Sequence, residues 1–171
     1  LTIKNKKVEK IIDNILLKIL SYDESFLGNF NGKFKIKFDE LNNKLIKQGE
    51  IDFTINEKKI ILNKAKFKLD KIGYIDSKIS FVENNEDIKF ASSNRLYIEN
   101  YIEFAKIFQI GSKKSKNIKQ INFDLVKNFG ETDFTISNVK INGLDNDIKS
   151  GEIFIIKNIQ NLRSYIRKVV D

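Results

Sequence analysis

The sequence predicts a β-dominated α+β protein in which one long, twisted antiparallel sheet carries a helix at each end and a short inserted helix. The first observation is a sequence motif that occurs twice, as Gly-Glu-Ile-Asp-Phe-Thr-Ile at 49–55 and as Gly-Glu-Thr-Asp-Phe-Thr-Ile at 130–136. Each copy is entered through glycine and then alternates apolar with polar residues, which is typical of a half-buried strand. The second observation is that similar stretches recur about every 12 residues with turn-forming residues between them, which favours an antiparallel meander.

The predicted elements follow one another without a linker, so we expect a single domain at 1–171 or a fragment of a larger β-rich protein. Apolar residues at helical spacing, among them Val8 and Ile11, predict the first helix, which we expect to dock on the sheet rather than on a membrane. Asn100 and Asn158 are the expected N-cap residues of the later helices. The elements are a helix at about 6–21, strands at about 30–99, a helix at about 100–109, strands at about 118–156 and a helix at about 158–169.

Lysine marks the solvent side of several predicted strands. In these stretches every second residue is apolar and nearly every residue between is lysine. The apolar members are Phe34, Ile36 and Phe38 in one stretch, and Ala65, Phe67 and Leu69 in another. The pattern predicts strands that turn one face to an apolar core and the other to water.

The composition argues against an enzyme. The chain has no His and no Cys, which removes the commonest general base, the thiol nucleophile and most transition-metal ligands. It contains no Gly-x-Ser-x-Gly elbow and no glycine motif for phosphate or dinucleotide binding. Asp52 and Asp133 are candidates for glycosidase-like chemistry, but both are expected on the solvated face of their strands. We predict no catalytic residue, no metal site and no cofactor.

The chain is basic, with 31 Lys and Arg against 23 Asp and Glu and a net charge of +8. Such a balance favours acidic partners such as nucleic acid or an anionic lipid surface. The densest basic cluster lies in a polar loop and consists of Lys113, Lys114, Lys116 and Lys119. Because basic residues are spread along the whole chain, we favour solvated lysines over a nucleic-acid site. Tyr97 and Tyr101 alone are too few for a base-stacking platform.

The remaining candidate site is the apolar face of the sheet. Helices can bury such a face, or a curled sheet can leave it open as a groove for acyl chains. An exposed apolar face of that size would need a partner or a ligand. The candidate lipid-contacting residues are Phe53, Ile55, Phe67, Leu69, Ile79, Phe81, Phe90, Phe134 and Ile136.

A family resemblance is carried by the repeated Gly-x-x-x-Phe-x-Ile strands, by the segments 45–97 and 104–143, and by the ending 158–163. Over most of its length the chain resembles the C-terminal region of AsmA-like proteins. The resemblance implies part of a large envelope protein of a Gram-negative bacterium, anchored in the inner membrane upstream of this chain and projecting into the periplasm. It also implies a role in outer-membrane biogenesis, with phospholipid carried along an apolar β-groove and no catalytic residues. The absence of an initiator Met suggests a piece cut from a longer polypeptide.

Three functions are compatible with these patterns. The first is a non-enzymatic module of an AsmA-like envelope protein that contributes to phospholipid transport or outer-membrane assembly. The second is a structural or protein-binding scaffold that uses an open sheet edge or the basic closing helix. The third is nucleic-acid binding through the basic surface, which we do not expect. The expected partners are phospholipid or other envelope proteins.

Overall fold

The computed structural model describes residues 2–4, 31–39, 45–56, 59–84, 87–111, 118–128, 131, 133–145 and 153–170. The predicted helix at 6–21 and the loop lysines Lys113, Lys114 and Lys116 lie outside these residues. The chain forms two compact units, Leu1–Asp70 (unit 1) and Lys71–Asp171 (unit 2). Both units are built mainly from antiparallel strands, so the predicted β-dominated meander is confirmed.

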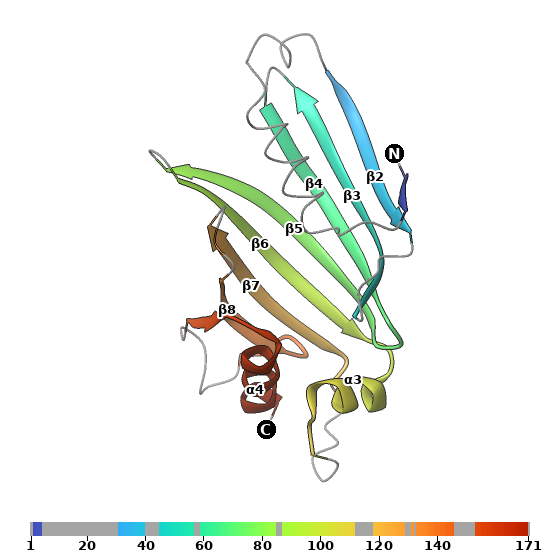
Figure 1. Ribbon diagram of the computed structural model, residues 1–171, viewed down its shortest axis with the longest axis vertical. Coiled ribbons are helices and arrows are strands. Elements are labelled where there is room, and N and C mark those ends of the chain that lie inside the picture. The colour runs from blue at the N-terminus through green and yellow to red at the C-terminus, as the bar shows by residue number, and fades with distance from the viewer. Residues whose placement is uncertain are drawn as a thin grey trace. The chain divides into compact units, whose positions relative to one another are not determined.

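Unit 1 is a strand meander with one additional strand (Figure 1). Its strands are β1 (Thr2–Lys4), β2 (Gly32–Asp39), β3 (Ile46–Asn56) and β4 (Lys59–Leu69). As predicted, β3 pairs antiparallel with β2 on one side and with β4 on the other. The alternation does not predict β1, which pairs with β2 in parallel, with Thr2 opposite Lys37. A parallel pair needs a long connection, and the chain from Lys4 to Gly32 is long enough to supply it.

One face of the unit 1 strands is apolar and the other carries lysine, as the alternation predicts. On the apolar face, Phe38, Phe53 and Leu69 have exposed fractions of 1%, 8% and 3%. On the opposite face, Lys33 and Lys37 are exposed. Apolar side chains of three neighbouring strands are therefore buried on one face, and the lysines stay hydrated on the reverse.

A β-bulge at Asn63 keeps the apolar side chains of β4 on one face. Asp52 of β3 pairs with Lys64 of β4. The next residue of β3, Phe53, pairs with Leu62, so Asn63 has no partner of its own on β3. An extra residue reverses the alternation that a strand would otherwise continue. Leu62 consequently lies on the apolar face beside Phe53.

Gly49, the first residue of the repeated motif, lies inside β3. It pairs with Phe38 of β2 and with Phe67 of β4. A Cβ atom at this position would lie 2.8 Å from Cδ1 of Phe67 and 3.5 Å from Cδ2 of Phe38. The glycine is needed because the Phe67 ring occupies the space above the backbone of β3.

Unit 2 is a second meander, and it carries both helices of the described chain. Its elements are β5 (Gly73–Asn84), β6 (Asp87–Ile98), α3 (Tyr101–Phe108), β7 (Gln120–Asn128), β8 (Phe134–Ile141), β9 (Leu144–Asp145), β10 (Phe154–Ile156) and α4 (Ile159–Val170). The strands β5 to β8 pair antiparallel in chain order, and β8 also pairs with β9 and β10. The inserted and closing helices thus form where the sequence predicts them.

Both helices begin at the predicted asparagine caps, which satisfy a backbone N–H group of the first turn. The Asn100 side-chain oxygen accepts a hydrogen bond from the Glu103 N–H at 3.2 Å. The Asn158 side-chain oxygen accepts one from the Asn161 N–H at 2.9 Å. The chain leaves α3 at Gln109, which adopts a left-handed conformation with φ of 58°.

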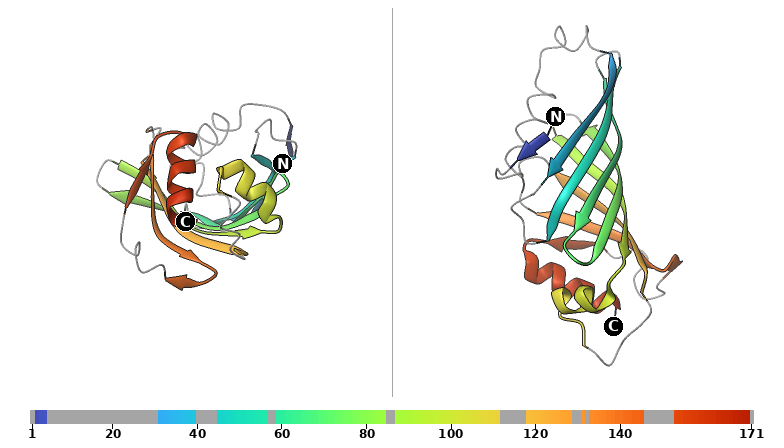
Figure 2. Two further views of the ribbon diagram at one scale, coloured as in Figure 1. Left: turned by 90° about the horizontal axis from the view of Figure 1, so that it is seen from below. Right: turned by 90° about the vertical axis from the view of Figure 1, so that its right-hand side faces the viewer.

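The two helices lie on the same side of the unit 2 strands, near the end at which β5 begins (Figures 1 and 2). Phe104 of α3 is fully buried, with an exposed fraction of 0%. The ring of Tyr165 in α4 lies 4.3 Å from the ring of Phe154 in β10. Arg163 Nε donates a hydrogen bond of 3.0 Å to the Ile107 carbonyl oxygen, which connects α4 to α3. Apolar packing and this bond together fix the helical cover.

A β-bulge in β8 keeps the apolar side chains of this strand on one face, as the bulge at Asn63 does in β4. Asn138 adopts a left-handed conformation with φ of 53°. Its side-chain Nδ2 donates a hydrogen bond to Oδ2 of Asp124 at 2.7 Å, and the register of β7 and β8 slips there. As a result, Ile136 and Val139 are both buried on the apolar face, although they are three positions apart.

We predict that Gly49→Ala destabilises the protein by about 1–2 kcal/mol, because the new methyl group would overlap the Phe67 ring and displace it. Chemical denaturation monitored by circular dichroism measures the change. Gly111→Ala is the matched control, since a Cβ atom there would meet nothing within 4 Å. Equal unfolding free energies for the two variants would contradict the packing of Phe67 over Gly49.

Candidate functional site

The structure divides the predicted lipid-contacting residues between the two units. The unit 1 members, on one face of β3 and β4, are Phe53, Ile55, Phe67 and Leu69. The unit 2 members with described side chains, on one face of β5, β6 and β8, are Ile79, Phe90, Phe134 and Ile136. Phe81 is placed by its backbone alone, which pairs with that of Phe90. Each group shares one face of its own unit, as the alternation predicts.

Burial differs between the two groups. In unit 1, Phe53 and Ile55 are each 8% exposed and Leu69 is 3% exposed, while Phe67 is half-buried. In unit 2, only Ile136 is buried, with an exposed fraction of 4%. The half-buried unit 2 members are Ile79, Phe90 and Phe134. Unit 2 therefore has more apolar side-chain surface within reach of a ligand.

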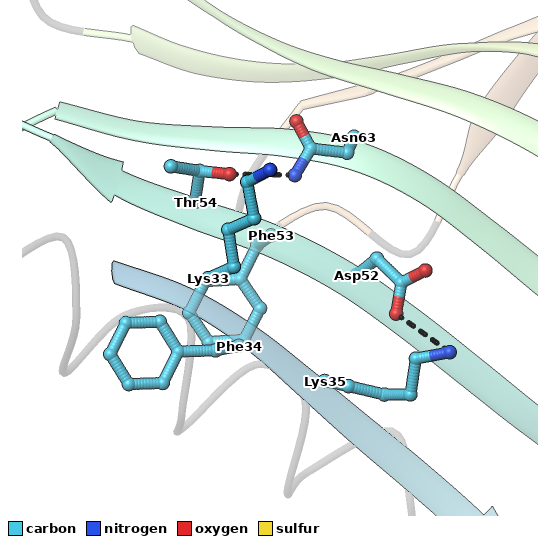
Figure 3. A pocket seen from close by; sticks show the side chains of 7 residues that line it. All are labelled: Lys33, Phe34, Lys35, Asp52, Phe53, Thr54 and Asn63. Carbon is cyan, nitrogen blue, oxygen red and sulfur yellow. Dashed lines mark hydrogen bonds and ion pairs between the residues drawn. The ribbon is translucent and has the colours of Figure 1, made fainter. Parts of the chain in front are cut away.

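An open hollow of about 460 Å³ lies beside β2, β3 and β4 in unit 1. The rings of Phe34 and Phe53 stack across β2 and β3 with their centroids 5.3 Å apart, and Phe34 is 37% exposed. Figure 3 shows this ring pair together with the polar side chains of the hollow. The hollow is lined by Lys33, Phe34, Lys35, Asp52, Phe53, Thr54 and Asn63. Its chemistry is mixed, with charged and amide groups next to the two rings.

The acidic residues considered for catalysis form ion pairs with lysines of their own units. Lys35 Nζ lies 3.3 Å from Oδ1 of Asp52 and 3.6 Å from Oε2 of Glu50. The hydrogen bond to Asp52, with the charges of both carboxylates, raises the pKa of the Lys35 ammonium group. Asp133 Oδ2 lies 3.9 Å from Lys157 Nζ in unit 2. Asp52 and Asp133 are 33% and 38% exposed, which agrees with the solvated faces predicted for them.

A polar row crosses the apolar face of unit 2. Ser77 Oγ donates a hydrogen bond of 2.7 Å to Oδ1 of Asn94. Asn94 Nδ2 donates in turn to Oγ of Ser92 at 2.9 Å and to the backbone oxygen of Ser92 at 3.1 Å. A further contact of Nδ2, at 3.4 Å, reaches the Phe123 carbonyl oxygen on the neighbouring strand. The position of the two serines on this face follows from the alternation, but the role of Asn94 depends on the register of three strands.

On β5 and β6 this row separates two parts of the unit 2 face, while on β7 the half-buried Phe123 lies level with Asn94. On the helix side of the row, Leu96, Ile98 and Ile121 have exposed fractions of 6%, 8% and 1%. On the side away from the helices, Ile79 and Leu125 are half-buried, and both lie level with Ser92 at the margin of the row. The helix-covered part is core, and the part beyond the row is the candidate ligand-contacting surface.

The tyrosines near residue 100 do not form one stacking platform. Tyr97 stacks on Tyr74 of the neighbouring strand, with ring centroids 4.6 Å apart. Tyr101 instead belongs to α3, where its ring lies 6.1 Å from that of Phe104. Arg95 Nη1 donates a hydrogen bond of 3.2 Å to the Tyr97 hydroxyl, and this bond raises the pKa of the guanidinium group. The Tyr74–Tyr97 pair could not be found from sequence spacing, because it depends on strand register.

Within the described residues, no group of three or more acidic side chains is placed to hold a metal ion. No helix among these residues is long and apolar enough to cross a membrane. No family model, curated protein or solved structure matches the chain.

We predict that Asn94→Ala destabilises the protein by about 1–3 kcal/mol, because the buried Ser77 and Ser92 would lose their hydrogen-bond partner. Thermal and urea unfolding measure the effect. Ser93→Ala, on the exposed face of the same strand, is the control and should change stability by less than about 0.5 kcal/mol. A neutral Asn94→Ala variant would show that the polar row does not hold the three strands together.

Proposed function

We propose that this chain is a non-enzymatic module of an AsmA-like envelope protein that contributes to phospholipid transport or outer-membrane assembly through an apolar β-sheet face. The observation that carries the proposal is the one-sided distribution of apolar side chains in both units, which is kept across β-bulges. The resemblance of the sequence to AsmA-like proteins agrees with it. In this proposal the sheet is long and twisted, and its apolar side forms a groove. The parent protein is anchored in the inner membrane and projects into the periplasm of a Gram-negative bacterium.

The unit 2 surface beyond the polar row is the part best suited to an acyl chain. Ile79 and Leu125 lie in one transverse row on either side of Ser92, and Phe90 lies two positions before Ser92 on β6. All three apolar side chains are half-buried, so each retains surface that a hydrocarbon could cover. Full burial of a side chain of this size is worth about 1.5–3 kcal/mol. Several such contacts would hold one acyl chain without any specific polar recognition.

The polar row gives this surface a boundary. Asn94 and its serine partners satisfy one another, so on β5 and β6 they offer no apolar surface along which hydrocarbon could continue toward the helices. Beyond them the core between α3, α4 and the strands is closed, with Phe104 and Val170 both at 0% exposure. An acyl chain on unit 2 would therefore lie over the strands and not enter the helix-covered core.

We predict that the double variant Ile79→Asn/Phe90→Asn retains roughly tenfold less phospholipid than the parent chain, because each side chain is already half-buried and can gain only about half of the ~1.5 kcal/mol that full burial is worth. Lipid extraction from the purified chain, followed by mass spectrometry, measures the retained phospholipid. The unfolding midpoint of each variant is measured in parallel, to exclude loss of the fold as the cause.

Ile153→Asn/Ile155→Asn is the matched control for this experiment. Ile153 and Ile155 are 70% and 60% exposed, and Ile155 alternates on β10 with the apolar-face residues Phe154 and Ile156. This variant should retain phospholipid like the parent chain. Absence of phospholipid from the parent chain, or equal loss in both double variants, would count against an acyl-binding face.

The second candidate function is a protein-binding scaffold, and the exposure of Ile153 and Ile155 favours it. Ile155 lies within β10 and Ile153 directly precedes it, and β10 pairs on one side with β8. An edge strand with exposed apolar residues can accept a strand from a partner by β-augmentation. The same variant separates the two functions. If Ile153→Asn/Ile155→Asn no longer binds an envelope partner but still retains phospholipid, partner binding is assigned to β10.

A further inference from the structure

The face of unit 1 opposite Phe53 carries a regular array of charges, which we call the lysine face. It consists of Lys33, Lys35 and Lys37 on β2, Glu50 and Asp52 on β3, and Lys64, Lys66 and Lys68 on β4. The register aligns these residues in rows across the strands, with Asp52 between Lys35 and Lys64, and Glu50 between Lys37 and Lys66. Six lysines face two carboxylates, which leaves four positive charges over three strands.

The lysine face is open to solvent. Among its lysines only Lys66 is half-buried, and the others are exposed. The carboxylates of Glu50 and Asp52 are more shielded, with side chains 35% and 33% exposed. Asp39 and Lys47 lie toward one end of the face and leave its charge surplus unchanged. The outermost groups of this surface are therefore ammonium groups.

An exposed isoleucine lies at the other end of the same face. Ile61 pairs with Thr54, which pairs on its other side with Lys33. The bulge at Asn63 reverses the alternation of β4, so Ile61 lies on the lysine face and is 51% exposed. Asn63 Nδ2 donates a hydrogen bond of 2.8 Å to Thr54 Oγ1, which holds the bulge in place beside Lys33 (Figure 3).

We propose that the lysine face docks on the surface of an anionic lipid bilayer, with its lysines over the headgroups and Ile61 inserted into the interfacial layer. Lysines near an anionic leaflet each add to binding, and an apolar side chain beside them adds burial at the acyl boundary. This inference is independent of the proposed function, because it uses the opposite side of the strands and needs no bound acyl chain.

The same face fits nucleic acid less well. Its described residues include no aromatic ring on which a base could stack and no arginine for bidentate phosphate contacts. A strand of nucleic acid lying along β3, between the lysines of β2 and those of β4, would also pass over Glu50 and Asp52. A bilayer surface responds instead to the summed charge of a face, and the exposed isoleucine favours lipid.

Co-sedimentation of the full 171-residue chain with vesicles tests the proposal. We expect binding to vesicles of phosphatidylcholine with added phosphatidylglycerol, weak binding to phosphatidylcholine alone, and a decline as salt is raised. The variant Lys33→Gln/Lys37→Gln/Lys68→Gln should bind anionic vesicles on the order of a hundredfold more weakly, at roughly fivefold per lysine. Ile61→Ser should weaken binding several-fold with little change in its salt dependence.

The matched control is Lys78→Gln/Lys106→Gln/Lys119→Gln, which removes three exposed lysines from unit 2 and changes the net charge equally. It should lose no more than a few-fold in vesicle affinity, and circular dichroism should show both triple variants folded. Equal losses in the two triple variants, or equal binding to neutral and anionic vesicles, would overturn the proposal. So would displacement of the chain from vesicles by single-stranded DNA that binds more tightly to the lysine face.

Discussion

The structure depends on keeping apolar side chains on one face of each strand across interruptions of register. Side chains alternate between faces with a period of two, so one extra residue would send the rest of a strand to the wrong side. In three strands the spacing of apolar residues changes from two to three where the register slips, and a β-bulge absorbs the difference. These steps run from Ile46 to Gly49, from Leu62 to Ala65 and from Ile136 to Val139. Without these bulges, side chains of the helix-covered core, of the apolar surface beyond the polar row and of the lysine face would lie on the wrong side of their strands.

The sequence predicts the features whose signals are local. Strand alternation and the caps Asn100 and Asn158 are encoded within a few residues, and the structure places them where they are expected. Pairing between distant segments has no such signal, which is why the parallel strand β1 is not predicted. Gly49 illustrates the same limit, because the need for glycine there comes from the Phe67 ring of the neighbouring strand. The bulges are visible in the sequence only as a change of spacing.

For the candidate site, too, the sequence predicts the local features and not the contacts between strands. Its described apolar residues fall on the expected faces, but their burial does not follow from alternation, because in unit 2 it depends on where the helices lie. Asn94 gave no signal in the sequence, since its partners Ser77 and Phe123 come from two other strands. The pairing of Tyr97 with Tyr74 likewise follows from register. Side-chain contacts between strands can be identified only once the register of the strands is known.

The two faces of unit 1 are coupled at Asn63. A sheet separates its faces by a single layer of backbone, so most substitutions on the lysine side leave the apolar side unchanged. The hydrogen bond from Asn63 to Thr54 is different, because it stabilises the bulge that places Leu62 on the apolar face and Ile61 on the lysine face. If this bond were lost and the bulge slipped, both side chains would exchange faces. The amide at residue 63 thus determines the chemical character of both surfaces at once.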